Sequence, residues 1–90
     1  MRALAAAYGV RVELDDLGDW GRVRLIAEYD PDGPTIRVDR RERGGVTIER
    51  AIAHELYHHR EAIGDVPRLR DRAERERAAD AYAGALLGDA

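Results

Sequence analysis

Two histidines and a glutamate in the segment AHELYHHREA, residues 53–62, have the spacing that a metal-dependent hydrolase needs. His54 and His58 are four positions apart, so on a helix they lie about 40° apart on one face. That spacing lets both imidazoles bind one tetrahedral zinc ion, while Glu55, about 100° around the helix, reaches a water molecule on the metal. The segment predicts a zinc site with Glu55 as the catalytic base. The competing interpretation is a charged amphipathic helix whose histidines are incidental.

A catalytic zinc ion needs a third protein ligand and an open position for water. Because the chain has no cysteine, that ligand must be His, Asp or Glu. Glu76 and Asp80 are four residues apart, in the middle of an apolar stripe that would face the core: Leu69, Ala73, Ala79, Ala83 and Leu87. Buried carboxylates are costly unless they are paired or bind a metal. We expect Glu76 to be the third ligand and Asp80 to accept a hydrogen bond from a ligand histidine. The alternative is a buried ion pair with arginines such as Arg72.

Nearby positions exclude one related class of metalloprotease and leave the oxyanion-stabilising group open. The pattern HExxHxxGxxH would need glycine at 61 and histidine at 64, where the chain has Glu61 and Gly64. We expect His59 to be exposed on its helix, and Tyr29 and Tyr57 to pack as aromatic side chains. Each of the three could instead stabilise an oxyanion. Zinc is favoured by ligand type, although imidazole and carboxylate also bind nickel, iron or manganese.

Hydrophobic periodicity and turn residues predict the elements that must position these side chains. We expect helices at 2–8, 47–62 and 67–87, and strands at 10–14, 22–29 and 35–39. Thr47 is the expected N-cap of the HExxH helix, Gly64 its C-terminal stop and Pro67 the start of the last helix. The prediction is one small α+β domain over residues 1–90, with a three-stranded antiparallel sheet packed on the HExxH helix and a C-terminal helix.

The composition and charge of the chain restrict the kinds of binding partner that we expect. The chain has 90 residues, a net charge of −3 and no long apolar run. We expect a cytoplasmic monomer or homodimer that does not bind membranes. The arginine-rich segment RLRDRAERER, residues 68–77, is interleaved with acidic residues, so we expect a solvated helix face with intrahelical ion pairs and no direct contact with nucleic acid.

Two segments resemble the ImmA/IrrE family of zinc metallopeptidases, a gluzincin group. GGVTIERAIAHELYHH is similar to that family's HExxH helix, and ERAADAYAGALL to its E-x-x-A-N/D-x-F-A segment. The resemblance covers residues 35–87, with Tyr57 where the family commonly has glycine and Tyr82 in place of phenylalanine. It implies a zincin-like fold, His54, His58 and Glu76 as zinc ligands, Glu55 as the base and Asp80 as a support for a ligand. It also implies a peptidase, often directed at a helix-turn-helix transcriptional repressor.

Three functions remain open at this point. The first is a zinc-dependent metalloendopeptidase acting on a protein or peptide substrate, which would lie extended along the edge formed by strands 22–29 and 35–39. The second is a catalytically silent or latent zinc-binding module that acts as a protein-interaction subunit. A fourth protein ligand, such as His59, would favour this second function. The third is a metal-free helical interaction protein.

Overall fold

The computed structural model describes residues 1–17, 19–20, 23–24, 26–42 and 45–88. It has helices α1 (Arg2–Ala7), α2 (Ile48–Ala62) and α3 (Arg72–Leu86). The strands are β1 (Arg11–Asp15), β2 (Asp19–Trp20), β3 (Val23–Arg24), β4 (Ala27–Asp30) and β5 (Thr35–Asp39). The α+β class is therefore confirmed.

The main sheet is mixed, so the predicted antiparallel sheet is wrong. Its strand order is β1-β5-β4, with β1 parallel to β5 and β4 antiparallel to it. The chain leaves β1, forms the separate β2–β3 pair and enters β4, then reverses through the turn at 31–34 into β5. Since the chain reverses before β4 and again before β5, β5 runs in the same direction as β1, and its place between β1 and β4 makes the β1–β5 pair parallel. The hairpin expected across 22–39 is confined to β4 and β5, and positions 22 and 25 lie outside the described residues.

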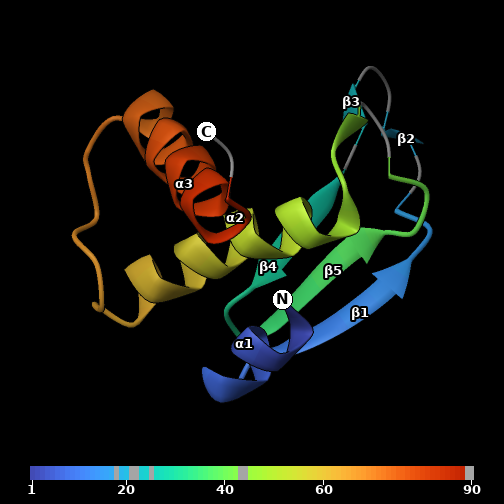
Figure 1. Ribbon diagram of the computed structural model, residues 1–90, viewed down its shortest axis with the longest axis horizontal. Helices are drawn as coiled ribbons and strands as arrows, with labels where there is room; N and C mark the ends of the chain where they lie inside the picture. The colour runs from blue at the N-terminus through green and yellow to red at the C-terminus, as the bar shows by residue number, and fades with distance from the viewer. Residues whose placement is uncertain (18, 21–22, 25, 43–44, 89–90) are drawn as a thin grey trace.

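One face of this sheet is apolar and the other is polar. Ile36 and Val38 alternate along β5 and are fully buried, as are Ile52 and Leu56 of α2, in the same core cluster. On the opposite face, Arg37 forms ion pairs with acidic side chains of both neighbouring strands, including Glu28 at 3.2 Å. A half-buried sheet of this kind packs one helix layer on its apolar face. Figure 1 shows α2 crossing that face, with α3 packed against α2.

The ends of α2 follow the sequence signals. The Thr47 side chain accepts a hydrogen bond from the main-chain N–H of Arg50 at 3.1 Å, as an N-cap residue does. At the other end, Gly64 has φ of +77°, which glycine adopts without strain. With these two ends, the HExxH segment, residues 54–58, lies in the middle of α2.

The last helix begins five residues later than predicted. Pro67 is not its first residue, because the side chain of Asp71 caps α3 by accepting a hydrogen bond from the N–H of Ala73 at 2.9 Å. Leu69 is exposed in the connection before it. Only Ala79 and Ala83 of α3 are fully buried, and these small residues allow close approach to α2.

None of the helices in the described part of the chain has the length and apolar character needed to span a membrane.

Candidate metal centre

Three predicted ligands converge where α2 meets α3. The atoms that His54, His58 and Glu76 offer to a metal all lie within 4.8 Å of one another. The two Nε2 atoms are 3.3 Å apart, Glu76 Oε1 is 3.3 Å from His58 Nε2, and Glu76 Oε2 is 2.8 Å from His54 Nε2. Ligands bound tetrahedrally to zinc at about 2.0–2.1 Å are about 3.4 Å apart. This group could therefore hold a metal ion with little rearrangement.

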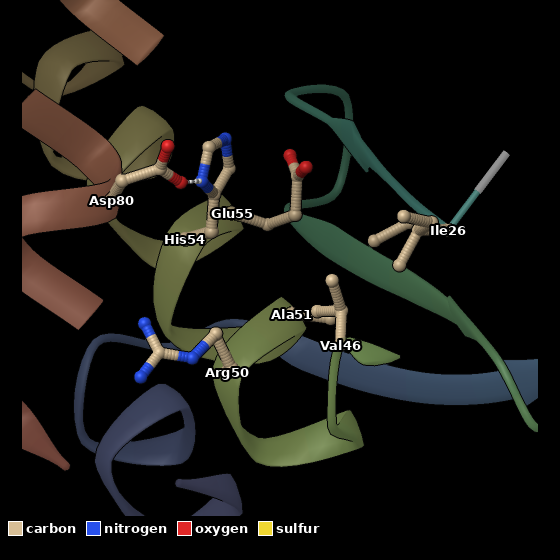
Figure 2. Close-up of a pocket in the computed structure, with 8 residues that line it drawn as sticks. Ile26, Val46, Arg50, Ala51, His54, Glu55 and Asp80 are labelled. Atoms are coloured by element: carbon tan, nitrogen blue, oxygen red, sulfur yellow. Dashed lines mark hydrogen bonds and ion pairs between the residues drawn. The ribbon is translucent and has the colours of Figure 1, made fainter. Parts of the chain in front are cut away.

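Asp80 contacts the other nitrogen of His54. Its Oδ1 lies 2.8 Å from His54 Nδ1, and the dashed line in Figure 2 marks this bond. This contact turns Nε2 toward His58 and Glu76, and a metal bound at Nε2 would leave Nδ1 as the donor of the ring to Asp80. Contact of this kind fixes the orientation of a metal-binding imidazole.

The burial expected for Glu76 and Asp80 is not observed. Their side chains are 46% and 72% exposed. Leu87, from the same stripe, is also exposed. Helical phase placed both carboxylates on the face expected to meet the core, but α3 packs mainly on α2, so this end of the contact is open to solvent.

Glu55 lies between two cavities. One, of about 300 Å³, has an apolar wall of Ile26, Ala27, Val46 and Ala51 and is also lined by Arg50, His54, Glu55 and Asp80. The other, of about 400 Å³, is lined by Tyr29, Glu55, His58, Arg72, Arg75 and Glu76. Figure 2 shows the Glu55 carboxylate and the His54 ring projecting from the same side of α2. Burial raises the pKa of Glu55, and the neighbouring His54 and His58 oppose that shift.

His59 does not have the exposed position expected for it. It is buried, and its Nδ1 lies 2.7 Å from the hydroxyl of Tyr29. Burial lowers the pKa of His59, and a hydrogen bond with the main chain of Tyr8 opposes this. Since Nδ1 faces Tyr29, Nε2 donates to the Tyr8 main chain and Nδ1 accepts the Tyr29 proton. Both ring nitrogens of the buried His59 therefore have hydrogen-bond partners. His59 is not part of the metal-ligand group found among the described residues.

Tyr29 and Tyr57 both pack against other aromatic side chains. The ring of Tyr57 lies 5.5 Å from that of Tyr82, so it packs as expected. The ring of Tyr29 contacts His59 at 5.6 Å, with its hydroxyl directed at that histidine. Neither contact directs a donor toward the His54–His58–Glu76 group.

Sequence reasoning missed Glu61 and Arg75. Glu61 occupies the position where the HExxHxxGxxH pattern has glycine, and its Oε1 lies 2.6 Å from His58 Nδ1. Arg75 was expected on a solvated face but binds Glu61 at 3.1 and 3.2 Å. Hydrogen bonds from Arg75 and His58 outweigh burial and lower the pKa of Glu61. The i, i+3 spacing of His58 and Glu61 was the available signal for the first contact.

Comparison of the chain with models of protein families, with curated proteins and with solved structures finds no match. By its fold and site, the chain is a small α+β protein with a two-histidine, one-glutamate group that could hold a metal ion.

Proposed function

We propose that this protein is a zinc-dependent metalloendopeptidase. The observation that carries the proposal is the convergence of His54, His58 and Glu76 from two helices, with Glu55 beside them at the junction of two cavities. Two imidazoles and one carboxylate form a donor set typical of catalytic zinc, because a position remains for water. The described residues supply three ligand atoms and not a fourth, which favours catalysis over a closed structural site.

The proposed chemistry assigns proton transfer to Glu55. Bound zinc would polarise the scissile carbonyl and make a water molecule more acidic. Glu55 accepts the proton of the attacking water and passes it to the leaving amine. Its partly buried position next to His54 and His58 suits both transfers, since Glu55 shares one cavity with His54 and the other with His58 and Glu76 without belonging to the ligand group.

The substrate would lie along β4. Strand β5 is hydrogen-bonded on both sides, so 35–39 cannot be the binding edge that was considered from the sequence. Strand β4 is an edge of the described sheet, and Ala27 and Tyr29 line the two cavities on either side of Glu55. An extended peptide adding to this edge would place successive side chains alternately. One of them would enter the apolar cavity lined by Ile26, Val46 and Ala51.

The motif resemblance to the ImmA/IrrE family supports the same assignment. It further implies a cytoplasmic regulatory protease whose substrate is a helix-turn-helix repressor.

The test combines metal content with cleavage of an unstructured protein such as casein. Protein purified without chelator should contain about one zinc per chain by mass spectrometry and should cleave the substrate. Glu55→Gln should retain zinc and lose cleavage by about 10²–10⁴-fold, the usual contribution of a general base. Glu74→Gln, on the exposed side of α3, is the matched control and should behave as the wild type. A wild type without zinc after zinc addition, or a fully active Glu55→Gln, would overturn the proposal.

A further inference from the structure

The carboxylate of Glu61 is buried beside the proposed metal centre. It follows His58 by three residues on α2, and its side chain is 2% exposed. Glu61 Oε1 lies 2.6 Å from His58 Nδ1. Because an ionised carboxylate only accepts, the ring must donate from Nδ1. In the neutral ring, which carries one N–H, the lone pair of Nε2 then faces His54 and Glu76.

Arg75 holds that carboxylate from the other helix. Its Nε donates to Glu61 Oε2 at 3.1 Å and its Nη2 to Oε1 at 3.2 Å, which is the bidentate geometry of a strong arginine–carboxylate pair. Arg75 directly precedes Glu76 in α3. A contact that locates Arg75 relative to α2 therefore also locates the third ligand.

The two histidines have unequal supports. Each uses Nε2 toward the metal centre and Nδ1 toward a carboxylate, Asp80 for His54 and Glu61 for His58. The Asp80 side chain is 72% exposed, whereas Glu61 is almost completely buried. Water competes with the first contact and hardly with the second, so the orientation of His58 should depend more strongly on its partner.

We propose that Glu61 and Arg75 form a positioning pair, in which Glu61 selects the His58 tautomer that leaves Nε2 available to the metal and Arg75 sets Glu76 at ligand distance. Neither residue belongs to the metal-ligand group. The inference rests on the proposed metal site, but its first test does not require metal.

That first test is the tautomer of His58 in metal-free wild-type protein, measured by long-range ¹⁵N–¹H NMR correlation of the imidazole nitrogens. A proton on Nδ1 of His58 is expected. His58 with its only ring proton on Nε2 would overturn the inference. Because this readout is independent of activity and of metal, it decides the role of Glu61 even if the wild type binds no zinc and the proposed function fails.

The second test is zinc affinity by competition with a chromophoric chelator. Glu61→Gln and Arg75→Gln should each weaken binding by about 10–100-fold, as loss of a partner to a ligand histidine commonly does. Asp80→Asn should weaken it less. Glu74→Gln and Arg77→Gln, at exposed positions on either side of Arg75 and Glu76 in α3, should match the wild type. Wild-type affinity in a folded Glu61→Gln or Arg75→Gln variant would overturn the proposal. If Glu61→Gln does not fold, Arg75→Gln and the wild-type tautomer still decide it.

Discussion

Nε2 of His54 and Oε2 of Glu76 lie 2.8 Å apart, although the two residues belong to different helices. A metal ion at this point would cross-link α2 to α3, and α3 has only two fully buried residues, Ala79 and Ala83. The stability of the contact between the helices should therefore depend on the metal.

We expect zinc to stabilise the folded protein. An ion that binds only the folded state contributes about 2.7 kcal/mol at a free concentration of 100 Kd. For a domain of this size, that raises Tm by on the order of 10 °C. Thermal unfolding followed by circular dichroism, with zinc and with chelator, measures the shift. His54→Ala and Glu76→Ala should remove most of it, and an equal shift in either variant would contradict the three-ligand site.

We expect Tyr29→Phe to reduce stability more than activity. The hydroxyl donates to the buried Nδ1 of His59, and an unsatisfied buried polar atom costs about 1–3 kcal/mol. Urea denaturation of the metal-free protein should show a loss of this size, while the substrate cleavage rate per folded molecule stays near that of the wild type. The opposite result, unchanged stability with a large loss of cleavage, would instead assign Tyr29 to oxyanion stabilisation.

We expect the apolar cavity to select an apolar side chain next to the cleaved bond. Val46→Phe would fill part of the space bordered by Ile26 and Ala51. Cleavage of peptides with leucine or methionine at that position should fall on the order of 10-fold relative to peptides with alanine. Mass-spectrometric profiling of a peptide mixture measures the preference. Val66→Phe, outside this cavity, is the control, and an unaltered profile in Val46→Phe would argue against this subsite.

We expect Thr47→Ala to destabilise the protein by about 1 kcal/mol, because it removes the acceptor for the Arg50 N–H at the start of α2. Thr47→Ser keeps the hydroxyl and should retain most of the stability. The free energy of unfolding from urea titration of the metal-free protein compares the two. Equal losses in both variants would show that the methyl group, and not the cap bond, is responsible.

Local signals in the sequence determined much of what the structure contains. The spacing of His54 and His58 indicated one helix face, and Thr47 and Gly64 indicated where that helix starts and stops. Helical phase also put Glu76 and Asp80 on one face of the last helix, although the burial expected for that face is not observed. These features follow from a repeat of 3.6 residues and from cap chemistry, which depend on neighbours within a few positions.

Only the tertiary structure decided the relations between distant segments. The insertion of β5 between β1 and β4 made the sheet mixed, because strand partners are chosen by global packing and not by chain order. Packing of α3 on α2 left Asp80 exposed while burying Glu61, although helical phase alone gave Asp80 the inward position. The pairing of Glu61 with Arg75, 14 residues apart, likewise required the two helices to be docked before either side chain could be recognised as part of the site.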